Sequence, residues 1–124
     1  MLIFVCSPLA AGGGRTMAGN IAAARDYRRQ VVLMGHYPIT PHLDLTEALD
    51  DNNPAEREIG LQIGETVLDR CEEVWVFGPR LSSGMRREIR RARKLGIHVV
   101  WYLDGDVHGV VGDNIILFER VEAA

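Results

Sequence analysis

The segment Gly78–Glu88, with the sequence GPRLSSGMRRE, combines two serines, a glycine and a glutamate at spacings that permit chemistry. Glu88 follows Gly84 by four residues, which places its carboxylate in the first turns of a helix that starts at the serine pair. A carboxylate in that position can act as a nucleophile or exchange a proton. The residues alone favour a simpler interpretation, in which Glu88 stabilises the helix dipole and pairs with Arg86 or Arg91.

A second candidate segment, Ser7–Thr16, carries the consecutive glycines Gly12, Gly13 and Gly14, followed by Arg15. Glycines let the backbone approach an anion, backbone N–H groups at a helix start favour negative charge, and an arginine can bind a phosphate. The segment matches neither the Walker pattern nor GxGxxG in the right register. Two interpretations therefore stay open: a phosphate-binding loop that begins at Ser7, and an ordinary surface loop.

His42 and Asp44 form a third candidate group, because they follow a predicted strand and can reach the same edge of a sheet. His42 could stack on or bond to a nucleobase, or it could be a structural loop residue. The remaining histidines lack the spacing of a metal site, so we expect neither a metal nor a cofactor: His36, His98 and His108.

Apolar runs and helical spacing predict the elements that position these residues. Strands are expected at residues 2–6, 36–40, 73–78, 97–103 and 114–118, and helices at 17–34, 54–71 and 82–95. The alternation of strands and helices is typical of a parallel sheet with helices on both faces. We therefore predict one α/β domain over residues 1–124, with three layers and a five-stranded parallel sheet.

The same spacing predicts which helical residues are buried. In the helix at 82–95 we expect Met85, Ile89 and Ala92 to face the sheet. In the helix at 54–71 the residues expected to be buried are Ile59, Ile63, Val67 and Leu68.

The composition limits the classes of protein that the chain can belong to. With 124 residues, 47% hydrophobic and 25% charged, it has an ordinary globular composition. No apolar run reaches the roughly 20 residues of a membrane span, and no signal peptide is evident, so we expect a cytoplasmic protein without a membrane partner. The net charge of −3 argues against nucleic acid as a partner.

Several stretches together are similar to one known family: SPL…GGGR, GHYPITPHL, DDNNPAEREIGL, CEEVWVFG and SSGMRREIRRARKLGI. Over residues 2–103 the chain resembles small bacterial and phage domains of the nucleoside 2-deoxyribosyltransferase-like superfamily. This resemblance implies a flavodoxin-like strand order, 2-1-3-4-5. It also implies a nucleotide or nucleoside as the ligand, and cleavage or exchange of its N-glycosidic bond.

The resemblance assigns roles within the segment SSGMRRE. Glu88 matches the glutamate that attacks the anomeric carbon, and Ser82, Ser83 and Gly84 match the start of the same motif. Relatives that act on free nucleosides have an aspartate where this chain has Ser82, whereas 5′-monophosphate glycosidases have serine. The resemblance therefore implies a nucleoside 5′-monophosphate as the ligand.

One position departs from the pattern of the resembling enzymes. An aspartate in the preceding helix corresponds to Gly64 here, and Glu65 lies beside it as a candidate for contacting the sugar or base. A non-catalytic nucleotide-binding module therefore remains an alternative to an enzyme. We also expect a homo-oligomer, because apolar residues such as Trp75, Met85 and Trp101 exceed what so small a core needs, and the resembling enzymes borrow residues from a neighbour.

Overall fold

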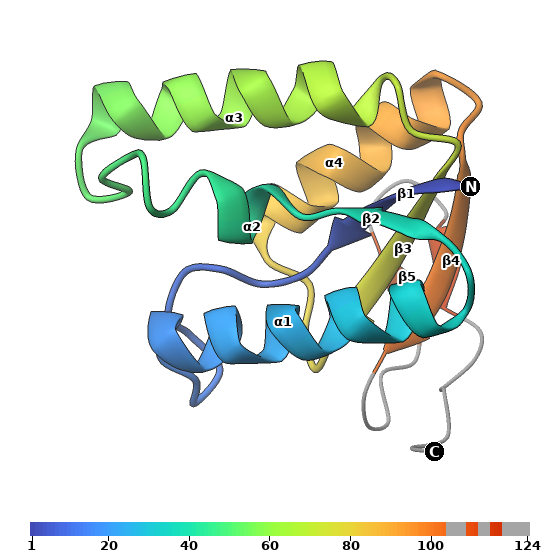
Figure 1. Ribbon diagram of the computed structural model, residues 1–124, viewed down its shortest axis with the longest axis horizontal. Helices are drawn as coiled ribbons and strands as arrows, with labels where there is room; N and C mark the ends of the chain where they lie inside the picture. Colours follow the sequence, from blue (N-terminus) through green and yellow to red (C-terminus); the bar gives the residue numbers. More distant parts are fainter. Residues whose placement is uncertain (104–108, 112–114, 118–124) are drawn as a thin grey trace.

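The computed structural model describes residues 1–103, 109–111 and 115–117 and forms an α/β domain around a parallel sheet (Figure 1). In chain order the elements are β1 (Leu2–Cys6), α1 (Met17–Leu33), β2 (Tyr37–Ile39), α2 (Pro41–Asp44), α3 (Pro54–Leu68), β3 (Glu73–Gly78), α4 (Ser83–Lys94), β4 (His98–Leu103), β5 (Gly109–Val111) and β6 (Ile115–Leu117).

The parallel sheet has the order β2-β1-β3-β4, with Phe4 opposite Val74 and Val76 opposite Trp101. These are the first four strands predicted from the sequence. The expected fifth parallel strand is wrong: residues 115–117 pair antiparallel with residues 109–111 as a separate two-stranded unit. An apolar run of this length has strand propensity, but its sequence does not specify the pairing partner.

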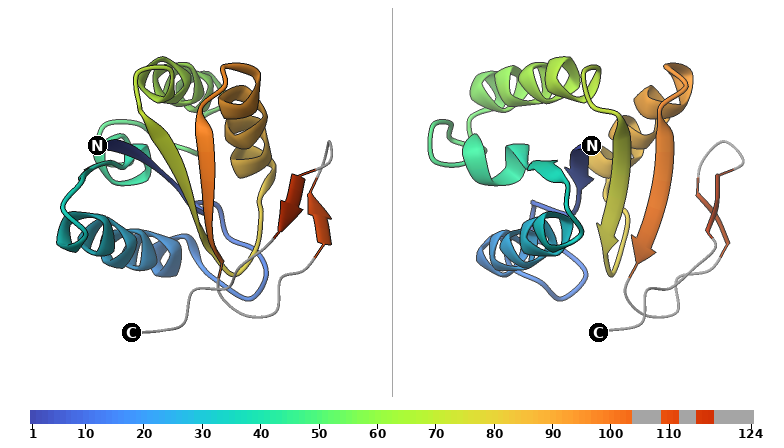
Figure 2. Two further views of the ribbon diagram at one scale, coloured as in Figure 1. Left: turned by 90° about the vertical axis from the view of Figure 1, so that its right-hand side faces the viewer. Right: turned by 45° about the vertical axis from the view of Figure 1, so that its right-hand side comes forward.

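Helices cover both faces of the sheet, as the three-layer prediction requires. Figure 2 shows α1 on one side and α3 with α4 on the other. Because side chains of a strand alternate, Ile3 and Val5 pack with Tyr27 and Val31 of α1. On the opposite face the fully buried core includes Phe4, Cys6, Leu68, Val74, Val76, Met85, Ile89 and Ala92.

The caps of the helices agree with their sequences. Thr16, Asn53 and Ser82 each accept a backbone N–H through the side chain at the starts of α1, α3 and α4. Near the start of α3, the Glu56 carboxylate accepts from the backbone N–H of Asp50 at 3.2 Å. The one-turn helix α2 after β2 was not predicted.

The residues of α3 that are buried differ from those predicted from the sequence. Leu68 is fully buried, but Ile59 and Ile63 are 47% and 42% exposed, so the expectation that they are buried is wrong. The helix contacts the core through its C-terminal end, while Gly60 and Gly64 face a pocket instead of the sheet. Helical spacing identifies an apolar face without identifying what covers it.

The core accommodates the large apolar residues that seemed excessive from the sequence. Trp75 is 3% exposed, Met85 1% and Trp101 5%, so these side chains do not supply a free apolar surface. In the part of the chain that the structure describes, no helix is long and apolar enough to cross a membrane.

Candidate active site

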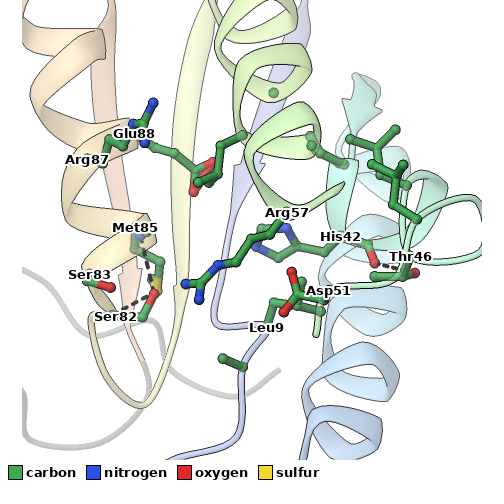
Figure 3. Close-up of a pocket in the computed structure, with 18 of the residues that line it drawn as sticks. Leu9, His42, Thr46, Asp51, Arg57, Ser82, Ser83, Met85, Arg87 and Glu88 are labelled. Carbon is green, nitrogen blue, oxygen red and sulfur yellow. Dashed lines mark hydrogen bonds between the residues drawn. The ribbon is translucent and has the colours of Figure 1, made fainter. Parts of the chain in front are cut away.

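A pocket opens at the carboxyl end of the sheet, where the segments after β1, β2 and β3 meet α3 and α4 (Figure 3). Its cavity volume is about 150 Å³, or about 990 Å³ when the open space at its mouth is included. The residues that matter for chemistry in its lining are Ser7, His42, Asp51, Arg57, Glu65, Ser82, Ser83, Gly84, Arg87 and Glu88. Most of the residues singled out from the sequence thus lie in one place.

Glu88 lies on the first turns of α4, partly buried, and lines the pocket. Neither ion pair allowed by the sequence forms, since among the described residues no cation pairs with Glu88 and Arg91 instead binds Asp69 through two contacts of 2.5 and 2.7 Å. Burial raises the pKa of Glu88 to about 8. The simpler interpretation of a surface ion pair is therefore wrong.

The thiol of Cys6 is the hydrogen-bond partner of Glu88. Cys6 ends β1 and is fully buried, and its Sγ lies 3.7 Å from Oε1 of Glu88 and 3.9 Å from the carbonyl oxygen of Met85. Burial and the neighbouring Glu88 carboxylate raise the pKa of the Cys6 thiol well above its ordinary value. The group therefore stays a thiol that donates weakly to the carboxyl of Glu88.

The start of α4 offers free hydrogen-bond donors to the pocket. Ser82 accepts the N–H of Met85 at 3.2 Å, and its own N–H points to the Met85 sulfur at 3.4 Å. The backbone N–H groups of Ser83 and Gly84 have no acceptor among the described residues. Unpaired N–H groups at a helix start, with the helix dipole behind them, suit a negatively charged group.

His42 and Ser7 form the wall opposite α4. The Nε2 atom of His42 donates to the carbonyl oxygen of Ser7, and burial lowers the pKa of His42, so its ring is neutral at pH 7. Ser7 is 1% exposed, and its hydroxyl has no partner among the described residues. Asp44, in contrast, is exposed and lies outside the pocket lining.

Glu65 lines the pocket but is held by a cation. Its Oε1 accepts from Nε of Arg87 at 2.6 Å, which ties α3 to α4. Gly64 also lines the pocket, and a Cβ atom there would meet nothing within 4 Å.

The glycine-rich loop lies outside the pocket lining and contacts an arginine instead. Gly13 has a φ of +57°, and a Cβ atom there would meet the Arg80 side chain at 2.9 Å. The Arg80 guanidinium also donates to the carbonyl oxygen of Ala10 at 2.8 Å. Gly12 and Gly13 therefore accommodate Arg80, whereas nothing lies within 4 Å of the Cβ position of Gly14. Arg15 keeps one buried nitrogen without a partner among the described residues.

Sequence reasoning missed several residues of the pocket, notably Asp51 and Arg57. They lie in the stretch DDNNPAEREIGL, which contributes to the family resemblance but to which that resemblance assigns no site residue. The spacing of Leu45 and Leu49, four residues apart in a polar stretch, was a signal for a helical turn over the pocket.

Comparison with known proteins shows similarity of fold. A 2-deoxyribosyltransferase from the psychrotolerant bacterium Bacillus psychrosaccharolyticus superposes with a TM-score of 0.66 at 12% sequence identity, covering 83% of this chain and 72% of that one. No curated protein sequence matches the chain. The model of one family, the domain of unknown function DUF7768, matches residues 1–102. The chain therefore belongs to the DUF7768 family, on a fold shared with a 2-deoxyribosyltransferase.

Proposed function

We propose that the protein binds a nucleoside 5′-monophosphate and cleaves or exchanges its N-glycosidic bond, with Glu88 as the nucleophile. One observation carries the proposal: Glu88 lines an open pocket at the carboxyl end of the sheet without a pairing cation among the described residues. A carboxylate free of a cation is available to a carbon that develops positive charge. The fold shared with a 2-deoxyribosyltransferase supports a nucleoside-related substrate.

The reaction follows from the carboxyl group. The ionised carboxylate of Glu88 attacks the anomeric carbon, and the C–N bond breaks with its electron pair leaving on the base. The base takes a proton from water at the open mouth of the pocket, and a glycosyl ester forms on Glu88. Water then releases the sugar phosphate, or a second base displaces Glu88 to give a new nucleotide, and the carboxylate is regenerated in both cases.

A non-catalytic binding module is the second candidate, and a specific observation favours it. Gly64 supplies no carboxylate to the sugar, and Glu65 beside it is engaged by Arg87 at 2.6 Å. In this case the pocket would bind a nucleotide without turning it over.

Incubation with a panel of ribo- and deoxyribonucleoside 5′-monophosphates, with detection of free base, separates the two candidates. Wild type releases base if it is an enzyme, whereas Glu88→Ala does not but binds the nucleotide within about tenfold of wild type. Glu47→Gln, an exposed carboxylate outside the pocket, is the matched control and keeps activity. Equal turnover by Glu88→Ala would remove Glu88 from the mechanism.

We also propose that a second copy of the chain closes the open pocket. The exposed Ile59 and Ile63 lie on α3, the same helix that supplies Gly60 and Gly64 to the pocket wall. An isologous dimer is the commonest way to cover such a face. Light scattering at micromolar concentration tests this proposal, and a monomer mass with binding intact would contradict it.

A further inference from the structure

We infer that Arg57 of α3 is the specificity-determining residue that binds the 5′-phosphate of the substrate, an inference that rests on the proposed function. Arg57 and Glu88 line the same pocket from different helices. Figure 3 shows the Arg57 side chain crossing the pocket, with its guanidinium directed toward the N-terminal end of α4. The two elements face each other at the end of the pocket that Ser82 lines.

Arg57 is available to a ligand because the protein does not neutralise it. The ion pairs among the described residues are those of Arg87 with Glu65 and of Arg91 with Asp69, and Arg57 takes part in neither. The arginine side chains that donate hydrogen bonds to described residues are those of Arg80, Arg87 and Arg91, and not that of Arg57. Arg80, the arginine against the glycine-rich loop, is in contrast bonded to Ala10. A guanidinium that is free and directed into a pocket suits the fork of oxygens on a phosphate.

The wall opposite Arg57 supplies further donors. The backbone N–H groups of Ser83 and Gly84 are unpaired within the described chain, and α4 has no acidic residue in its first turn. Ser7, which follows β1, also lines this pocket, is 1% exposed and has a hydroxyl without a partner among the described residues, so a ligand could bond to it. Donors thus line the pocket from the segment after β1, from α3 and from α4.

The carboxylates of the pocket form no ion pair with Arg57 among the described residues. Glu65 pairs with Arg87, and Glu56 accepts from the backbone N–H of Asp50 at 3.2 Å. Burial lowers the pKa of His42, and the charge of Asp51 raises it in part. No described ion pair therefore has to break before Arg57 binds an anion.

The distance along α4 between its first residues and Glu88 leaves room for a sugar between the phosphate and the reacting carboxylate. Glu88 follows Gly84 by four residues of helix, a rise of about 6 Å. If the phosphate is held between Arg57 and the start of α4, the sugar ring lies between the phosphate and Glu88. This arrangement assigns phosphate recognition to Arg57 and not to Arg15, which lies outside the pocket.

The test measures the affinities of the four deoxynucleoside 5′-monophosphates and of their nucleosides by calorimetry, for wild type and for Arg57→Gln. We expect wild type to prefer monophosphates, and Arg57→Gln to lose roughly tenfold to a hundredfold in monophosphate affinity with nucleoside affinity unchanged. Arg57→Lys should recover part of the loss. Salt should weaken monophosphate binding more in wild type than in Arg57→Gln.

A control variant separates phosphate binding from a general effect of charge. Arg90→Gln removes the same charge from an exposed position of α4 outside the pocket and should keep the preference. A loss in Arg90→Gln equal to that in Arg57→Gln would show that the effect is one of net charge and would overturn the inference.

The other outcomes decide against the inference in distinguishable ways. A preference for monophosphates that survives in Arg57→Gln overturns the role of Arg57 and leaves the proposed function standing. Equal losses for nucleosides and monophosphates in Arg57→Gln, or a lowered melting temperature of that variant, indicate a structural role and also overturn the inference. A wild type that binds neither class overturns the proposed function, and the inference with it.

Discussion

Replacing Glu88 by glutamine is expected to stabilise the protein at alkaline pH and to leave its stability unchanged at acid pH. Burial raises the pKa of Glu88 from its ordinary value of 4.5 to about 8. Below pH 4.5 the carboxyl is protonated in both the folded and the unfolded chain, so wild type and variant carry the same charge there. Between pH 4.5 and about pH 8 the carboxyl of Glu88 is ionised in the unfolded chain but protonated in the folded chain. The free energy of unfolding therefore falls as the pH rises through this interval.

The magnitude follows from the interval between the two pKa values, 4.5 and about 8. One pKa unit corresponds to about 1.4 kcal/mol, so a carboxyl wholly shielded from water would lose roughly 4–5 kcal/mol across the interval. Glu88 keeps partial contact with solvent, and screening by water reduces the expected loss to about 2–3 kcal/mol. Above pH 8 the carboxyl is ionised in both states, and the loss stays constant.

Urea unfolding of wild type and Glu88→Gln at several values between pH 4 and pH 9 measures this difference directly. Cys6 is the group whose pKa the substitution can change, and burial keeps its thiol protonated over this pH range in the folded chain. The other groups titrate alike in the two proteins, so the difference in the free energy of unfolding reports Glu88. The exposed control Glu47→Gln should show no such trend. A difference between wild type and Glu88→Gln that is constant with pH would refute the reasoning, as would a wild type more stable than the variant at pH 9.

Three further predictions follow from the same structure. If Glu88 is the nucleophile, initial rates of base release should rise about tenfold from pH 7 to pH 9. With a pKa of about 8, the ionised fraction of Glu88 rises over that interval from about a tenth to about nine tenths. A rate that falls with pH would instead assign Glu88 the role of an acid. Leu68→Ala should cost about 2–5 kcal/mol in urea unfolding and Ile63→Ala less than about 1 kcal/mol, because Leu68 is fully buried and Ile63 is 42% exposed; equal losses would contradict the burial of α3. Gly78→Ala should lower the melting temperature, because Gly78 has a φ of +114° and a Cβ there would meet Pro8 at 2.8 Å; an unchanged value would contradict that geometry.

The sequence predicts the parallel sheet because buried strands and amphipathic helices leave periodic signals. The runs at 2–6 and 73–78 are apolar on both faces, as strands covered by helices must be. The caps at Thr16, Asn53 and Ser82 place the helix starts within a residue or so. The run at 114–118 carries the same local signal but pairs elsewhere, because the pairing partner depends on long-range contacts.

The candidate site is predictable only in part, for a similar reason. Ser82, Ser83, Gly84 and Glu88 lie within one short segment, so local spacing is enough to bring them together. Arg57 comes from another helix, and only the packing of that helix across the pocket gives it a role. In the glycine-rich loop the local sequence is ambiguous, because glycines allow either a phosphate or a side chain to approach the backbone. In the structure the group that approaches is the Arg80 side chain.

The chemistry of Glu88 depends on residues that no motif contains. Cys6 reaches the carboxyl because β1 ends beneath the first turns of α4, and its thiol lies 3.7 Å from Oε1. A cation at that position would hold the carboxyl ionised and occupied, whereas a thiol is a weak donor that leaves the pKa of Glu88 near 8. Of the two arginines that the sequence offers to Glu88, Arg91 binds Asp69, and Arg86 forms no ion pair among the described residues. Arg87, the neighbour of Glu88 in α4, binds Glu65. Glu88 therefore has no cationic partner in the described part of the chain, as the proposed nucleophile requires.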